Sequence, residues 1–212
     1  PAGLAAARSF VELDVPFLLL DQASELGGAL NVVASPLFLF AGVDEQAKLG
    51  VHDSPEKLAA DWIEMTGGQG DQSWVHKLAT QSTPKVYEWL KALGARFELR
   101  ADASDVGSVP RALAFIGTGE SLAKLLSSGL PAASIRLSRK VTQLLHDNGA
   151  LQQVVWQTAG NVKQTGCISA RAVLVTSGGF AHSRDKVRQA RPALTDRDSW
   201  HGVPRWATGS GL

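Results

Sequence analysis

The sequence predicts an α/β protein in which a parallel sheet is combined with a small antiparallel β-meander. Two short apolar runs, 17–20 and 172–176, are continuous rather than alternating, which is typical of parallel strands buried on both faces. Between them, residues 135–168 alternate with a period of two and contain turn signals, so they predict antiparallel strands. Segments with helical periodicity separate these strands.

The first predicted element is a helix over 2–13, which is rich in Ala and Leu and has no N-cap residue before it. The strand 17–20 follows and ends at Asp21. Because the chain begins with Pro1 rather than methionine, and inside a helical pattern, we expect its start to be a cut.

A second helix is predicted to begin at Ser54, an N-cap residue that Pro55 and an acidic residue follow, and to end at Gly67. Its buried stripe is expected to contain Leu58, Ala59, Trp62 and Ile63.

Two more helices are predicted, one from Asp71 and one from Thr83-Pro84 to Gly94. We expect core packing, not ligand stacking, for their tryptophans. The inward residues of the first are Trp74, Val75 and Leu78, and those of the second are Val86, Trp89, Leu90 and Leu93.

A loop is predicted over 99–117, which contains Pro110, and a helix over 120–127 follows it. The meander then begins near residue 135. Its first long hairpin is expected to turn at Asn148-Gly149, a dipeptide that favours tight β-turns.

Composition excludes several classes of function. The net charge is +1 and the 21 Lys and Arg are scattered, so we expect no nucleic-acid partner. No apolar stretch reaches the length of a membrane span. The single cysteine, Cys167, excludes an internal disulfide and indicates a reducing, cytoplasmic compartment. The five histidines lack metal-ligand spacing, so we expect no metal site.

Three features point to a dinucleotide site. Gly3 opens a helix, and Asp21 ends the next strand eighteen residues later, which is part of the dinucleotide-binding fingerprint. An ordinary helix–strand pair that ends in a polar residue explains Gly3 and Asp21 equally well. Gly27-Gly28 offers backbone N–H groups that can approach a pyrophosphate, with a plain turn as the alternative. Glycines also follow Thr176, at the end of a predicted buried strand, where ligands of open α/β sheets bind. Ser177 does not lie in the G-x-S-x-G pattern of a hydrolase.

Together the residues resemble the fumarate reductase/succinate dehydrogenase flavoprotein superfamily, especially its flavocytochrome c, 3-ketosteroid dehydrogenase and FAD-binding dehydrogenase branches. The resemblance covers nearly all of the chain. It is carried by PAGLAAA, LLLDQASELGG, GVHDSPEKLAADWIEMTGG, VYEWLKALGARFE, SVPRALAFIGTGESLAKLL, LVTSGGF and ATGSGL, in order and spacing. It implies a Rossmann-like FAD-binding domain, 1–212, cut short at both ends, with a downstream capping domain missing.

The resemblance also implies the cofactor contacts. Gly3 matches the third fingerprint glycine beside the FAD pyrophosphate, Asp21 the acid that binds the adenosine ribose, and Gln22 its polar neighbour. The backbone of Val141 matches the position that meets the adenine. The segment that runs along the pyrophosphate is matched by Gly27, Gly28, Ala29 and Leu30. The strand end over the dinucleotide is matched by Thr176, Ser177 and Gly178.

Four departures from the family pattern stand out. Ala29 replaces the Asn, Ser or His of relatives and cannot form a covalent flavin link, so we expect non-covalent FAD. Ser35-Pro36 stands where two glycines usually lie near the flavin, and Leu113 stands where a His is usual. The last motif, 208–211, lacks its acid.

The implied activity is hydride transfer at a carbon–carbon bond next to a carbonyl or carboxylate of a small-molecule substrate, with an unidentified electron donor or acceptor. The family's proton-donor Arg and substrate-binding His lie beyond residue 212, so the catalytic residues are unknown and we expect the fragment alone to be inactive. Two alternatives stay open. The chain belongs either to another FAD enzyme, such as a monooxygenase or amine oxidase, or to a truncated, non-catalytic dinucleotide-binding domain.

Overall fold

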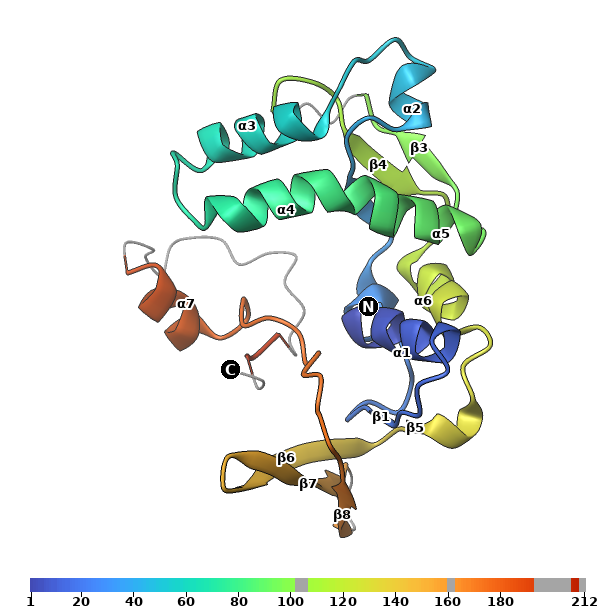
Figure 1. Ribbon diagram of the computed structural model, residues 1–212, viewed down its shortest axis with the longest axis vertical. Coiled ribbons are helices and arrows are strands. Elements are labelled where there is room, and N and C mark those ends of the chain that lie inside the picture. The colour runs from blue at the N-terminus through green and yellow to red at the C-terminus, as the bar shows by residue number, and fades with distance from the viewer. Residues whose placement is uncertain (102–106, 160–162, 193–206, 210–212) are drawn as a thin grey trace. The chain divides into compact units, whose positions relative to one another are not determined.

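The computed structural model describes residues 1–101, 107–159, 163–192 and 207–209 (Figure 1). It divides into two compact units. Unit 1 consists of Pro1–Val32 and Leu126–Leu212, and unit 2 consists of Val33–Leu125.

Unit 1 begins with helix α1, Ala2–Glu12, as the sequence predicts. The predicted strand after it is shortened to β1, Leu19–Leu20, which pairs in parallel with β5, Ile135–Arg136. A 3-10 helix, Gly28–Val32, follows β1 in sequence. Helix α7, Arg184–Ala190, lies near the C-terminal end of the described residues. Unit 1 therefore contains the parallel pairing that defines the predicted fold class.

The predicted meander is confirmed as the sheet β6-β7-β8. Strand β6, Arg139–Asp147, turns at Asn148-Gly149, where both residues have positive φ, into β7, Ala150–Thr158. Strand β8, Thr165–Ser169, closes the antiparallel sheet. The two residues of β5 pair outside this sheet with β1, so the meander starts later than the period-two pattern suggests.

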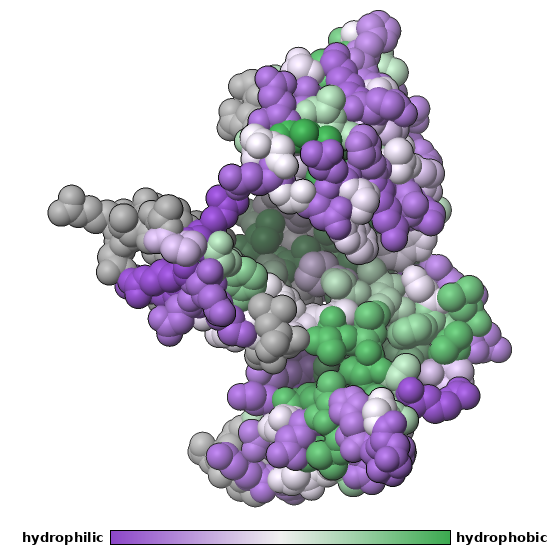
Figure 2. Space-filling model, turned by 60° about the vertical axis from the view of Figure 1, so that its left-hand side comes forward, coloured by the Kyte–Doolittle hydropathy of each residue, from purple (hydrophilic) through white to green (hydrophobic). Residues whose placement is uncertain are grey.

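The predicted strand over 172–176 is wrong, because these residues form no strand in the structure. Leu174 is 62% exposed and Val175 is 52% exposed, and neither pairs with a strand among the described residues. An apolar run becomes a strand only where a neighbouring backbone satisfies its N–H and C=O groups. Figure 2 shows hydrophobic surface on unit 1 above the meander.

Unit 2 contains a three-stranded antiparallel sheet in the order β2-β4-β3. These strands are Leu37–Leu39, Ala112–Phe115 and Phe97–Leu99 respectively. The prediction of a loop over 99–117 is therefore wrong over 112–115, where all four residues of β4 are buried. Stacked and edge-on aromatic rings form the core beside this sheet, with contributions from Phe38, Phe40, Tyr87, Phe97 and Phe115.

The helices of unit 2 are α2, Asp44–Ala47, α3, Pro55–Met65, α4, Gln72–Ser82, and α5, Glu88–Ala92. Helix α6, Gly119–Ser127, begins in the same unit. The start of α3 is as predicted, since the Ser54 hydroxyl accepts a hydrogen bond from Lys57 N. Figure 1 shows α3 and α4 side by side.

Two predictions about these helices are wrong. No new helix begins at Thr83, because α4 continues through a π-turn, Thr83–Tyr87, directly into α5. The wider turn accommodates Pro84, which has no N–H to donate, and it changes which side chains face inward. Tyr87 is therefore buried while Val86 is 40% exposed. The expected inward residues Trp62, Trp74 and Leu78 are also exposed, by 40%, 59% and 62%.

Candidate functional site

The first turn of α1 lies against the segment that follows the meander. A Cβ atom added to Gly3 would lie 2.8 Å from Thr176 Oγ1 and 3.6 Å from Leu19 Cδ1. The backbone of α1 thus approaches Thr176 more closely than a Cβ atom normally can, whereas the distance to Leu19 of β1 is an ordinary van der Waals contact. The first turn of α1 holds no acidic residue, so no carboxylate of its own offsets the partial positive charge there.

Asp21 ends β1 next to this helix terminus. Its Oδ1 accepts a hydrogen bond of 2.9 Å from Ala23 N, which fixes the turn after the strand. Leu19, two residues before Asp21, lies beside the first turn of the same helix, so the end of β1 and the start of α1 are close together. Gln22 is exposed beside it.

The backbone of Asp21 is also tied to the start of the meander. Its N–H donates to Arg136 O at 3.1 Å, and its carbonyl accepts from Arg139 N at 2.8 Å. Val141 lies two residues beyond Arg139 in β6, opposite Trp156, and is 40% exposed. The pairing of β1 with β5 therefore brings Asp21 and the chain leading to Val141 together.

The Gly27-Gly28 segment forms a separate turn. Both glycines have positive φ, and Leu30 N donates to Gly27 O at 3.1 Å. A Cβ atom on Gly27 would lie 2.0 Å from Asn31 Oδ1, whereas a Cβ atom on Gly28 would meet open space. Ala29 is half-buried and Leu30 is 7% exposed. Among the described residues this turn makes no hydrogen bond to Gly3 or Asp21.

Asn31 is a residue of this turn that the sequence analysis missed. Its side-chain nitrogen donates to Leu26 O at 3.0 Å and to Glu25 Oε1 at 3.2 Å. Its Oδ1 is buried and has no hydrogen-bond partner among the described residues. Buried polar atoms are nearly always paired, so an oxygen without a partner is unusual at this turn. The sequence signal that could have identified Asn31 is its position, as a polar residue three positions after the glycine pair.

The remaining predicted residues lie on the exposed segment after the meander. The Thr176 side chain lies next to Gly3. Ser177 and Gly178 are exposed. Gly178 has a φ of +86°, and a Cβ atom added at Gly178 or Gly179 would meet open space. Gly209 N donates to Gly179 O at 3.1 Å, so Gly209, the last described residue of the final motif, lies beside this segment. Ser210 and Gly211 lie outside the described residues.

A second polar cluster lies in unit 2, and the sequence analysis missed it. Arg111 is fully buried and binds Asp53 in a bidentate ion pair, with Nε–Oδ2 at 3.0 Å and Nη2–Oδ1 at 2.8 Å. Its Nη1 donates to Asp61 Oδ2 at 2.6 Å. Gln46 completes the cluster with a bond of 2.8 Å to Asp53 and one of 2.9 Å to Pro110 O.

Burial and hydrogen bonding act in opposite directions on Asp61. Burial raises its pKa, but the hydrogen bonds from Ser108 and Arg111 outweigh burial and leave the pKa below its ordinary value. The charges of this cluster are thus satisfied within the protein, as expected of a structural network rather than of a catalytic pair. Leu113, which stands at the position of the family's usual histidine, is fully buried in β4 two residues further on.

Other kinds of site receive no support in the described part of the chain. No group of three or more His, Cys, Asp or Glu side chains there is arranged to hold a metal ion. No helix in the described ranges is long and apolar enough to cross a membrane. Cys167 is a free, exposed residue of β8.

Comparison with known proteins places these features in context. A family model described as FAD binding domain matches residues 1–212. Fumarate reductase 1 of Saccharomyces cerevisiae is 29% identical over 223 residues, which cover 99% of this chain and 46% of that protein. A KsdD-like steroid dehydrogenase of Mycolicibacterium smegmatis is 28% identical over 227 residues, covering 92% of this chain and 41% of that protein.

A solved structure shows the same fold. The open conformation of a flavocytochrome c3 fumarate reductase matches with a TM-score of 0.74 and 21% identity, over 99% of this chain and 36% of that one. The chain therefore spans less than half the length of these three proteins.

Proposed function

The chain belongs to the FAD binding domain family, and from this premise we propose that it is the FAD-binding portion of a flavin-dependent oxidoreductase. The observation that carries the proposal is the close approach of Gly3, in the first turn of α1, to Thr176 and to β1, the strand that Asp21 follows. A helix terminus and an acid at the end of the next strand are the two groups that dinucleotide folds use for pyrophosphate and ribose.

The proposed contacts follow from this arrangement. Asp21 accepts hydrogen bonds from the adenosine ribose, with Gln22 at the rim, and the backbone of Val141 contacts the adenine. The N–H groups at the start of α1, including that of Gly3, bind the pyrophosphate. The turn Gly27, Gly28, Ala29 and Leu30 follows the cofactor toward the flavin, and Thr176, Ser177 and Gly178 cover the dinucleotide.

Two observations on the turn after β1 support the fit. The space at Gly28 lets the cofactor approach the backbone, which a side chain there would prevent. The unpaired Oδ1 of Asn31 accepts a hydrogen bond from a hydroxyl of the cofactor. Ala29 carries only a methyl group, so it holds FAD without a covalent bond. We take both units as parts of one FAD-binding domain, because a single family model covers them.

The activity of the whole protein is proposed from its relatives, which are named as fumarate reductases and steroid dehydrogenases. We infer hydride transfer at a carbon–carbon bond next to a carbonyl or carboxylate of a small molecule. Bound FAD supplies the hydride chemistry, while this chain binds and orients the cofactor. The single cysteine supports a reducing, cytoplasmic setting.

Competition between ligands tests the binding proposal. FAD is titrated into the purified chain and its fluorescence is followed, first alone and then with ADP or riboflavin as competitor. ADP should displace FAD, because the proposed contacts lie mainly on the adenosine and pyrophosphate, whereas riboflavin at the same concentration should displace much less. Asp21→Ala should weaken FAD binding about tenfold through loss of a charge-assisted hydrogen bond. Displacement by riboflavin alone would refute the assignment of the adenosine half to unit 1.

A further inference from the structure

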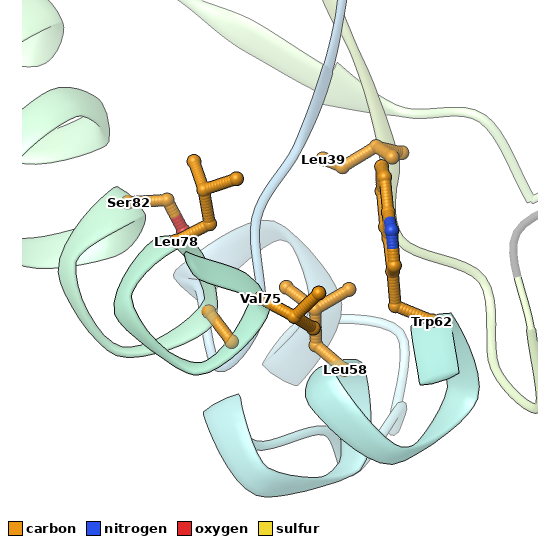
Figure 3. A pocket seen from close by; sticks show the side chains of 7 residues that line it. Leu39, Leu58, Trp62, Val75, Leu78 and Ser82 are labelled. Carbon is orange, nitrogen blue, oxygen red and sulfur yellow. The ribbon is translucent and has the colours of Figure 1, made fainter. Parts of the chain in front are cut away.

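Two cavities in the described parts of the chain differ in the groups that line them. The groove between α3 and α4 in unit 2 is lined by Leu58, Trp62, Val75 and neighbouring side chains that carry no charge (Figure 3). Such a lining selects no particular ligand. The second cavity lies in unit 1, has a volume of about 290 Å³ and is lined by two arginines as well as by apolar side chains. It can therefore distinguish charged ligands from neutral ones.

The apolar wall of the cavity in unit 1 comes from the chain around β1 and from the meander. Its side chains are Leu18, Leu20, Trp156 and Ile168. The two leucines alternate with Leu19, which lies beside α1, so they belong to the other face of the strand. A Cβ atom on Gly166 would lie 2.4 Å from Trp156 Cζ2, so the indole packs directly on the backbone of β8. This fixed aromatic ring and the aliphatic side chains suit the apolar body of a ligand.

Arg136 and Arg139 line the same cavity because the chain turns between them. Residues three apart on a straight strand would lie on opposite faces. Ser138, with a φ of +53°, interrupts the chain between β5 and β6, and both arginines line the cavity. The register of β6 and β7 places Arg139 on the same face of the meander as Trp156, and its Cζ lies 4.7 Å from the centre of the indole ring. The Arg139 guanidinium thus lies directly on the apolar wall.

Neither guanidinium is neutralised within the described residues. In both arginines only Nη1 makes hydrogen bonds, which go to backbone carbonyl groups at 2.8 to 3.4 Å. Neither arginine forms an ion pair with a described carboxylate, and the nearby Asp21 directs its Oδ1 to Ala23 N instead. Arg136 is exposed and Arg139 is half-buried, so a ligand can reach them from solvent. Each retains Nε and Nη2 donors in the planar fork that matches a carboxylate.

We propose that this cavity binds an aromatic carboxylate, which lays its rings against the apolar wall and accepts hydrogen bonds from Arg136 and Arg139. An apolar cavity of roughly 150 Å³ holds one benzene ring, so about 290 Å³ has room for two fused rings. The carboxylate pairs with the guanidiniums, and no acidic side chain in the described lining repels it. The proposal goes beyond FAD binding, because none of the residues that line the cavity is among the proposed cofactor contacts.

Fluorine NMR of two matched probes tests the proposal in the 212-residue chain at neutral pH. 6-Fluoro-2-naphthoate is ionised under these conditions, and 6-fluoro-2-naphthylmethanol has the same rings without the charge. Each probe is titrated, and its line width and chemical shift give its Kd. The unaltered chain should bind the naphthoate about tenfold more tightly than the alcohol, because hydrogen bonds between charged groups are stronger than neutral ones.

Arg136→Gln and Arg139→Gln should each weaken binding of the naphthoate about tenfold and leave the alcohol unchanged. Leu18→Ala shortens the apolar wall at a residue that is 38% exposed, so it should weaken both probes. Lys140→Gln is the matched control, because Lys140 is an exposed cation of β6 on the opposite face from Arg139 and does not line the cavity. It should alter neither Kd, and circular dichroism should show that each variant is folded.

Equal affinity for the two probes, or equal losses in Lys140→Gln and the arginine variants, overturns the proposal. Lack of saturable binding overturns it as well. A final titration adds FAD to the chain with its bound naphthoate, which should stay in place, whereas displacement would assign the cavity to the dinucleotide site. A chain that binds the naphthoate but not FAD would refute the proposed function alone.

Discussion

Gly3 in the first turn of α1 lies so close to Thr176 that a Cβ atom on it would be 2.8 Å from the threonine Oγ1. This contact joins the beginning of the chain to the segment after the meander. It also explains why glycine is needed at a helical position where its conformational freedom is otherwise a disadvantage.

Replacing Gly3 by valine should destabilise the protein. The new side chain would collide with Thr176 and approach Leu19, and overpacking of this kind costs about 1–3 kcal/mol. Urea denaturation measures the loss. Ala2→Val, at the neighbouring exposed position, controls for the cost of a β-branched residue in the helix. Adding Thr176→Ala to Gly3→Val should restore part of the stability, and no recovery in the double variant would show that the contact is not the cause.

Replacing Arg111 by methionine should cost about 3–5 kcal/mol of unfolding free energy. The substitution leaves the carboxylates of Asp53 and Asp61 buried without their cation, although a side chain of similar length remains. Thermal and urea denaturation measure the change. Lys124→Met is the matched control, since the exposed Lys124–Glu120 pair should contribute less than about 1 kcal/mol. Equal effects of the two substitutions would contradict the structural role of the buried cluster.

The lowered pKa of Asp61 predicts that the protein loses stability in acid. The pKa of Asp61 is lower in the folded state than its ordinary value of 3.8, so the folded state favours the charged form. The stabilisation is therefore complete well above pH 3.8 and is lost as the pH falls through the lower folded value. Urea denaturation at a series of pH values measures this slope. Asp61→Asn should flatten it, and an unchanged slope in the variant would assign the acid sensitivity to other groups.

The pKa of the Tyr87 phenol can be measured directly by absorbance, because Tyr87 is the single tyrosine in the sequence. Burial, together with a hydrogen bond to Glu45, raises its pKa from 10.0 to about 12. Tyrosinate absorbance of the folded chain should therefore rise only near pH 12, against 10 in denaturant. Since the folded state favours the neutral phenol, this contribution to stability is present below pH 10 and is lost between 10 and about 12. A folded-state midpoint near 10 would place the phenol in water instead.

Local signals in the sequence predicted much of the fold. Ser54-Pro55 marks the start of α3, and Asn148-Gly149 marks the hairpin, because capping and turn chemistry act over a few residues. The predicted strand over 172–176 failed because an apolar run cannot indicate whether a partner strand lies beside it. Strand β4 was missed because its four residues stand after a stretch of turn-forming residues, and only pairing with β2 and β3 makes it a strand.

The candidate site was predictable where it depends on sequence spacing, as for Gly3 and Asp21. The Arg111 cluster was not, because its acidic partners lie 58 and 50 residues away and no local pattern joins them. The exposure of Trp62 and Trp74 could not be predicted either, since helical spacing shows which residues share a face but not what covers that face.

Release of flavin from the purified chain tests the central claim most directly. The protein is saturated with FAD, freed of excess cofactor by gel filtration and precipitated with acid, and the flavin absorbance of both fractions is measured. We predict that FAD binds unit 1 and that Ala29 forms no covalent link to it. About one FAD per chain should therefore pass through the column with the protein and stay in the supernatant after precipitation. Absence of flavin from the filtered protein, or flavin that remains in the precipitate, would contradict it.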